Sequence, residues 1–137
     1  MKETPKIMVI DDDPDFINAI SMMLKVAKYD VVAALSPGQV KEKMLAHKPD
    51  LILIDSYAEG SFDARELCAE IKSSPRFRQL SATPVVFITS GKNDPREKPG
   101  GASHGRGKKG PDAYLEKPLK MEDMLSTIDE LLRLRKR

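Results

Sequence analysis

The sequence lacks the features that build disulfide-rich, membrane-spanning or strongly charged proteins. It has a single cysteine, Cys68, which excludes an internal disulfide framework and suits a reducing compartment. No apolar stretch approaches the roughly 18 residues that a membrane span requires, and residues 1–5 lack the apolar core of a signal peptide. The net charge of +2 gives no overall field that would attract nucleic acid or a membrane. We therefore expect a cytoplasmic protein that binds neither.

The length of the chain fits one folded domain. With 137 residues it lies near the usual domain size of about 100–150 residues. Such a chain buries a hydrophobic core but leaves no room for a second folded unit. We therefore expect a single domain over residues 1–137.

Two apolar runs end on carboxylates, and this repetition is the most informative feature of the chain. Residues 6–10 lead directly into Asp11, Asp12 and Asp13, and residues 51–54 end on Asp55. If both runs are buried parallel strands, their carboxyl ends lie side by side, where open α/β sheets place ligand sites. Unit charges about 4 Å apart repel by roughly 1 kcal/mol in water and about 4 near a protein surface. Clustered carboxylates there predict a hard divalent cation such as Mg²⁺.

A hydroxyl pair and a lysine close two further segments. The apolar run 84–88 ends on Thr89 and Ser90, and the short segment 113–116 ends on Lys117, which Pro118 follows. The order is an acidic pair, a single aspartate, Thr-Ser and Lys-Pro, each at the end of an expected strand. This order resembles the receiver domain of two-component response regulators. The resemblance covers nearly the whole chain.

Strand and helix patterns alternate along the sequence. After the first strand, Asp13 is expected to cap a helix and Pro14 to take its first position. Residues 30–35 predict a second strand, and Ser36 with Pro37 predicts a second capped helix start. Apolar residues at helical spacing mark the helices: Phe16, Ile17, Ile20, Met23 and Leu24; Val40, Met44 and Leu45; Leu67, Cys68 and Ile71; Met121, Met124, Leu125, Ile128, Leu131 and Leu132. This alternation predicts a doubly wound parallel sheet, and the resemblance implies the five-stranded, flavodoxin-like order 2-1-3-4-5.

The stretch 91–111 does not fit this alternation. It is rich in Gly, Pro and Lys and has no apolar periodicity, so we expect a mobile loop that replaces or shortens the fourth helix of a receiver. Its local charge is +6 − 2 = +4, from Lys92, Arg96, Lys98, Arg106, Lys108 and Lys109 against Asp94 and Glu97. The loop is either simply solvated or a docking patch for an acidic partner. Interleaved aromatic residues are missing, so nucleic acid is not the expected partner.

The resemblance implies how the acidic residues act. Asp55 would be the phosphoacceptor, taking a phosphoryl group from a phosphohistidine. Asp12 would bind Mg²⁺ directly and Asp11 chiefly through water. Asp55 and the backbone carbonyl of Tyr57 would complete the protein ligands. Whether the unusual loops at 56–63 and 91–111 alter Mg²⁺ affinity or switching is left open.

The resemblance also implies roles for the residues that close the last two strands. Thr89 would hydrogen-bond to the phosphoryl oxygens and Lys117 would pair with them. Tyr114 would form a switch together with Thr89, turning inward after phosphorylation. Positioning and charge neutralisation of this kind are what phosphoryl transfer needs most.

The implied partner is a sensor histidine kinase or a histidine phosphotransfer protein. The only chemistry expected of the chain itself is its own phosphorylation and dephosphorylation, so it is not expected to be an enzyme in the usual sense. The downstream protein partner is unknown, and a homodimer is left open.

Two other functions remain as alternatives. The chain could be a receiver-like interaction scaffold that signals without phosphorylation. It could also be a phosphatase of the haloacid dehalogenase type, because Asp11-x-Asp13 after an apolar strand resembles that family's first motif. The short chain, the missing Thr two residues after Asp13 and the idle Asp55 disfavour the phosphatase. Simpler interpretations also exist, with the acidic pair as a helix cap and Lys117 as a surface lysine.

Overall fold

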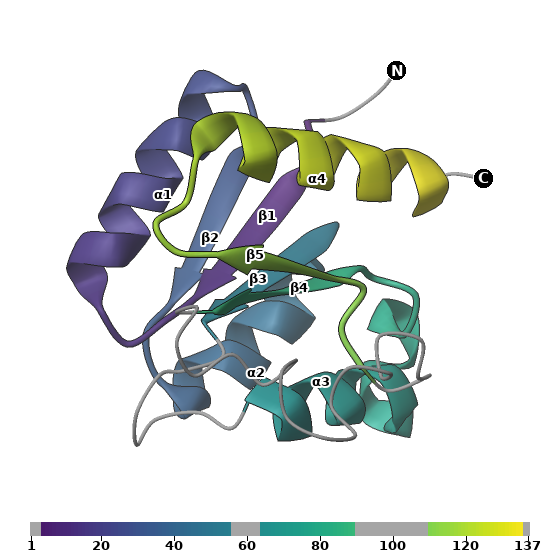
Figure 1. The fold of residues 1–137 in the computed structure, drawn as a ribbon. Coiled ribbons are helices and arrows are strands. Elements are labelled where there is room, and N and C mark those ends of the chain that lie inside the picture. The colour runs from purple at the N-terminus through teal and green to yellow at the C-terminus, as the bar shows by residue number, and fades with distance from the viewer. Residues whose placement is uncertain (1–3, 56–63, 90–109, 136–137) are drawn as a thin grey trace, which may run out of the picture.

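A parallel sheet organises the chain in the computed structural model, which describes residues 4–55, 64–89 and 110–135 (Figure 1). The sheet has five strands in the order β2-β1-β3-β4-β5. Their bounds are β1 Lys6–Ile10, β2 Asp30–Ala34, β3 Leu51–Asp55, β4 Val85–Thr89 and β5 Ala113–Glu116. This topology confirms the predicted doubly wound, flavodoxin-like class. The second strand ends one residue earlier than predicted, at Ala34.

Four α-helices in the described residues cover the two faces of the sheet. α1 (Pro14–Val26) and α4 (Met121–Arg135) lie over one face, and α2 (Pro37–His47) and α3 (Ala64–Ser73) lie over the other (Figure 1). A 3₁₀ helix, η1 (Pro75–Leu80), follows α3 and was not predicted from the sequence. No helix in the described ranges is long and apolar enough to cross a membrane.

Alternating side chains of the strands separate two hydrophobic cores. On β1, Ile7 and Val9 pack into the core beneath α1 and α4, whereas Met8 and Ile10 pack into the core beneath α2 and α3. Strands β3 and β4 are buried along their whole length, as expected for central strands of a sheet covered on both faces. Cys68 is buried in the core beneath α2 and α3, as predicted.

The first two helices begin in different ways. The Oδ1 atom of Asp13 accepts a hydrogen bond from the Asp15 N–H at 3.0 Å, which confirms Asp13 as the cap of α1. Ser36 occupies the same position before α2, but its hydroxyl makes no capping bond. Instead, Gln39 Oε1 reaches back and accepts from the Leu35 N–H at 2.8 Å. The predicted start of α2 with Ser36 as its N-cap residue is therefore confirmed, although the Ser36 hydroxyl makes no capping hydrogen bond.

Two aspartates fasten neighbouring strands at the amino edge of the sheet, and we call Asp50 and Asp112 the amino-edge aspartates. Asp50 precedes β3, donates its N–H to the Lys6 carbonyl and accepts the Lys6 N–H on Oδ2, both at 2.8 Å. Asp112 precedes β5 and makes the same pair of bonds with Val85, at 2.7 and 2.8 Å. Its Oδ2 also lies 2.8 Å from Lys72 Nζ of α3. Each aspartate thereby sets where its strand begins against a neighbour.

Two expected features fall outside the described residues. Tyr57 and its loop lie within 56–63, and the stretch 91–111 is described only at its last two residues. The replacement of the fourth receiver helix by a loop therefore stays a prediction. The helix labelled α4 here is the long final helix that was predicted after β5.

Candidate functional site

The carboxyl ends of four strands meet at one edge of the sheet. Asp55 is in register with Ile88, and Thr89 is in register with Glu116, so the residues that close these strands are neighbours. The predicted site residues that the structure brings to this edge are Asp11, Asp55, Thr89 and Lys117. The sequence prediction of a shared polar edge is therefore confirmed in its position.

The best-defined contact at this edge joins Asp55 to Lys117. The Lys117 Nζ lies 3.2 Å from Asp55 Oδ2, and the side chains are 33% and 7% exposed, respectively. The Lys117 N–H donates to the Thr89 carbonyl at 2.8 Å, so the β4–β5 ladder extends to the residue that carries the ammonium. Both partners are thus fixed by strand backbone, and their charge-assisted hydrogen bond is of the stronger kind.

Asp11 is buried beside Asp55, and one of its carboxylate oxygens has no hydrogen-bond partner among the described residues. Its Oδ1 accepts the Asp13 N–H at 3.1 Å, while its buried Oδ2 meets no hydrogen-bond donor among the described residues. Burial, followed by the charge of Asp55 and a hydrogen bond between the two carboxyl groups, raises the pKa of Asp11 from 3.8 to about 7. Lys117 and the Asp13 N–H oppose this shift. Burial next to a second carboxylate therefore makes the ionised form of Asp11 unfavourable in the folded protein.

The three consecutive aspartates take different positions. Asp12 is exposed, Asp13 caps α1, and only Asp11 is buried. Over residues 4–55, 64–89 and 110–135, no three His, Cys, Asp or Glu side chains are grouped so as to hold a metal ion. Mg²⁺ in proteins keeps several waters and needs only one or two carboxylates. The buried Asp11 oxygen accepts no hydrogen bond from the described residues and lies next to a second carboxylate. Oxygen ligands of this kind fit Mg²⁺.

Thr89 brings a hydroxyl to the same edge. The residue is completely buried, and its Oγ1 meets no partner among the residues that the structure describes. A buried hydroxyl without a partner costs free energy, and native proteins pair most such groups. The hydroxyl is therefore available for a hydrogen bond to a group bound at this edge.

Tyr114 lies on β5, three residues before Lys117. It is half-buried and packs edge to face against Phe87 of β4, with ring centroids 5.9 Å apart and an interplanar angle of 86°. Both rings belong to the core beneath α2 and α3. A switching role for Tyr114 remains a prediction, and Tyr57 lies outside the described residues.

Sequence reasoning missed one neighbour of the lysine. The Lys117 Nζ lies 4.3 Å from the centre of the Phe16 ring, on the first turn of α1. Phe16 was recognised from the sequence only as part of the apolar stripe of α1. Its position three residues after the Asp13 cap places it close to the acidic edge, which is the one signal that could have identified it.

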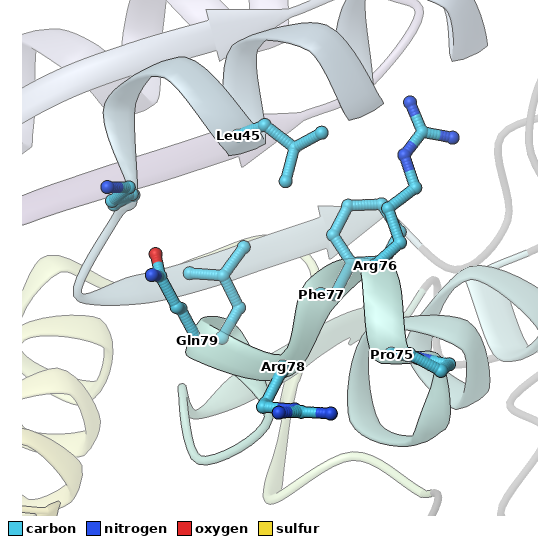
Figure 2. A pocket seen from close by; sticks show the side chains of 8 residues that line it. Leu45, Pro75, Arg76, Phe77, Arg78 and Gln79 are labelled. Atoms are coloured by element: carbon cyan, nitrogen blue, oxygen red, sulfur yellow. The ribbon is translucent and has the colours of Figure 1, made fainter.

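A pocket elsewhere on the surface does not belong to this site. It has a volume of about 520 Å³ and opens between the end of α2 and η1 (Figure 2). Its lining residues are Leu45, Lys48, Pro75, Arg76, Phe77, Arg78, Gln79 and Leu80. These residues precede β3 and β4 in the chain, so the pocket lies toward the amino ends of the strands.

Comparison with known proteins identifies the class. The family model for the response regulator receiver domain matches residues 7–129. The chain belongs to this family and is a receiver domain of response regulators. The family match favours this class over the dehalogenase-type phosphatase.

Particular relatives give the match its extent. The chain is 30% identical over 128 residues to the response regulator ArlR of Staphylococcus saprophyticus, covering 93% of this chain and 52% of that protein. It is 30% identical over 129 residues to the DNA-binding dual master transcriptional regulator RpaA of a Synechocystis species, covering 94% and 49%. The chain thus spans about half the length of these curated relatives.

A solved structure supports the fold. The CheY-like receiver domain protein of Methanospirillum hungatei superposes with a TM-score of 0.77 at 20% identity, covering 98% of both chains. A receiver domain from a histidine kinase of Syntrophus aciditrophicus gives a TM-score of 0.78 at 22% identity, covering 98% of this chain and 94% of that one. At these identities the likeness concerns the fold alone.

Proposed function

We propose that Asp55 accepts a phosphoryl group from the phosphohistidine of a sensor histidine kinase or a histidine phosphotransfer protein. The observation that carries this proposal is the buried Asp55 carboxylate with Lys117 Nζ at 3.2 Å. The Thr89 hydroxyl, which has no partner among the described residues, and the buried Asp11 at the same edge support it. The membership of the receiver family supplies the class of donor.

The proposed step is an in-line transfer between two nucleophiles. An Asp55 oxygen attacks the phosphorus, the P–N bond of the phosphohistidine breaks, and the imidazole leaves with the bonding electron pair and is neutral at that nitrogen. The product is a mixed carboxylic–phosphoric anhydride, and attack of water on its phosphorus returns Asp55 and inorganic phosphate. Lys117 compensates the charge on the phosphoryl oxygens while Thr89 donates a hydrogen bond to one of them. Positioned donors of this kind supply most of the catalysis in phosphoryl transfer.

The residues that would hold Mg²⁺ follow from the resemblance and from the donor set. Asp11, Asp12 and Asp55 would provide carboxylate oxygens, directly or through water, and the Tyr57 carbonyl would provide a backbone oxygen. When bound, the ion would neutralise charge on the phosphoryl oxygens as they approach Asp55. The raised pKa of the buried Asp11, next to the carboxylate of Asp55, supports a cation here.

We extend the proposal to the setting of the domain. Residues 1–137 would act as a single receiver domain in a cytoplasmic two-component or phosphorelay pathway, with no enzymatic activity beyond its own phosphorylation and dephosphorylation.

Acetyl phosphate with Mg²⁺ tests the proposal by mass spectrometry. One phosphoryl group should be added, labile to hydroxylamine as an acyl phosphate is, and Asp55→Asn should abolish it. Asp15→Asn is the matched control, because Asp15 is an exposed carboxylate on the first turn of α1. A wild-type protein that stays unmodified by both acetyl phosphate and phosphohistidine donors would support the scaffold alternative. Modification that survives in Asp55→Asn but disappears in Asp11→Asn would support the dehalogenase-type chemistry.

A further inference from the structure

The ammonium of Lys117 is held from two sides. Asp55 Oδ2 lies 3.2 Å from Nζ, and the centre of the Phe16 ring lies 4.3 Å from the same atom. The face of an aromatic ring carries partial negative charge and attracts a cation within about 6 Å of its centre. Among the described residues, the lysine, whose side chain is 33% exposed, therefore has one ionic partner and one aromatic partner.

The Phe16 ring is itself fixed by the fold. It is half-buried on the first turn of α1 and packs against the core beneath α1 and α4. The helix start that places the ring is set by the Asp13 cap. The same short segment thus carries the buried Asp11 and the ring, one on each side of that cap.

We propose that Phe16 is a positioning residue that keeps the Lys117 ammonium at the acceptor during phosphoryl transfer, an inference that rests on the proposed phosphorylation of Asp55. The two partners of the lysine differ in what the reaction does to them. Asp55 changes from a carboxylate to an anhydride, whereas the ring is unchanged. A contact that persists through the step keeps a flexible lysine from leaving when its ionic partner is altered, and the lysine then meets the phosphoryl oxygens without a search over rotamers.

The rate of phosphorylation by acetyl phosphate at saturating Mg²⁺ tests the role. Phe16→Leu retains an apolar side chain but removes the ring face, and we expect the rate constant to fall about three- to tenfold. Phe16→Tyr keeps the ring face and should stay within about twofold of wild type. Met23→Ala is the packing control, because Met23 packs against the same core about two turns further along α1. It should leave the rate unchanged.

A spectroscopic signature separates positioning from general packing. The ε-methylene protons of Lys117, identified by their loss in Lys117→Gln, should be shifted upfield by the Phe16 ring in wild type and Phe16→Tyr, but not in Phe16→Leu. Unshifted protons in wild type, a Phe16→Leu rate equal to wild type, or a Phe16→Tyr rate as low as that of Phe16→Leu would each overturn the role of Phe16 while leaving Asp55 as acceptor. A wild-type protein that acetyl phosphate and phosphohistidine donors both leave unmodified would instead overturn the proposed function, and the positioning role with it.

Discussion

Carboxylates at the two edges of the sheet are treated in opposite ways. The amino-edge aspartates, Asp50 and Asp112, spend their side-chain oxygens on backbone N–H groups of neighbouring strands. At the carboxyl edge, Asp11 and Asp55 are buried side by side, and one oxygen of Asp11 has no donor among the described residues. The difference teaches that carboxylates bonded to backbone N–H groups hold neighbouring strands together at the amino edge, whereas the buried pair at the carboxyl edge fits the proposed Mg²⁺. One polar group near the amino edge is not hydrogen-bonded: the buried hydroxyl of Thr83 has no partner among the described residues, and nothing in the described structure explains it.

The largest expected effect is the response of the metal-free protein to pH. Because the pKa of Asp11 rises from 3.8 to about 7 on folding, the native state binds more protons than the unfolded state between these values. The contribution of Asp11 to stability is complete below about pH 4 and is lost as the pH rises through about 7. A shift of one unit corresponds to about 1.4 kcal/mol, so this group should lower the free energy of unfolding by roughly 2–4 kcal/mol over that range.

Urea denaturation in a metal chelator at several pH values measures this effect. Asp11→Asn should flatten the pH dependence and make the metal-free protein more stable than wild type near pH 7.5. The matched variant Asp50→Asn alters a carboxylate whose oxygen already accepts a backbone N–H, so the fall from pH 4 to 7.5 should persist in it. If the free energy of unfolding depended on pH equally in wild type and Asp11→Asn, folding would not raise the pKa of Asp11.

A smaller effect is expected at the amino edge, where removing a carboxylate should lower the free energy of unfolding, whereas Asp11→Asn should raise it near pH 7.5. Asp112→Ala removes the acceptor for Val85 N–H and for Lys72 Nζ, and a buried N–H left without a partner costs about 1–3 kcal/mol. The ion pair adds little, because the Asp112 side chain is 37% exposed. The free energy of unfolding should therefore fall by about 2 kcal/mol at neutral pH. Asp112→Asn keeps an acceptor oxygen and should cost roughly half as much.

The control for this variant is Asp129→Ala. Asp129 pairs with Arg133 along the exposed surface of α4, with side chains 58% and 75% exposed, so its loss should change stability by less than about 0.5 kcal/mol. If Asp112→Ala were as stable as Asp129→Ala, the amino-edge aspartates would not set the strands, and the contrast between the edges would fail.

The smallest effect is stabilisation by Mg²⁺. At an ion concentration about ten times its Kd, mass action adds about 1.4 kcal/mol. Thermal unfolding with and without Mg²⁺ should show this increase in wild type and in Asp112→Asn, but not in Asp11→Asn or Asp12→Asn. If Mg²⁺ left the melting temperature of the wild-type protein unchanged, the carboxyl edge would not be a Mg²⁺ site.

The carboxyl edge was predictable from sequence because apolar runs of strand length end directly on polar residues. Parallel strands bring their ends together, so Asp55, Thr89 and Lys117 could be assigned to one place before any coordinates. The distinction between a buried Asp11 and an exposed Asp12 could not be made, since it depends on how the chain turns from β1 into α1.

The amino edge was not predictable, because its bonds join residues far apart in the chain. Nothing local to Asp50 or Asp112 distinguishes them from ordinary aspartates in a turn, and their partners lie 44 and 27 residues away, respectively. Phe16 was hidden for a different reason. A phenylalanine at helical spacing predicts a core residue, and only the position of Lys117 in the finished sheet reveals its second contact.

The bonds of Asp112 have a consequence for how this protein can vary over evolution. They connect the start of β5 to the start of β4 and to α3, at the amino edge of the sheet. The chain leaves β4 at Thr89, at the opposite, carboxyl edge. The register of β5, and with it the position of Lys117, is then independent of how many residues connect the two strands. Doubling such a connection costs only about 0.6 kcal/mol of closure entropy. Insertions and deletions between Thr89 and Asp112 should therefore accumulate freely in descendants of this chain, while position 112 itself should remain acidic.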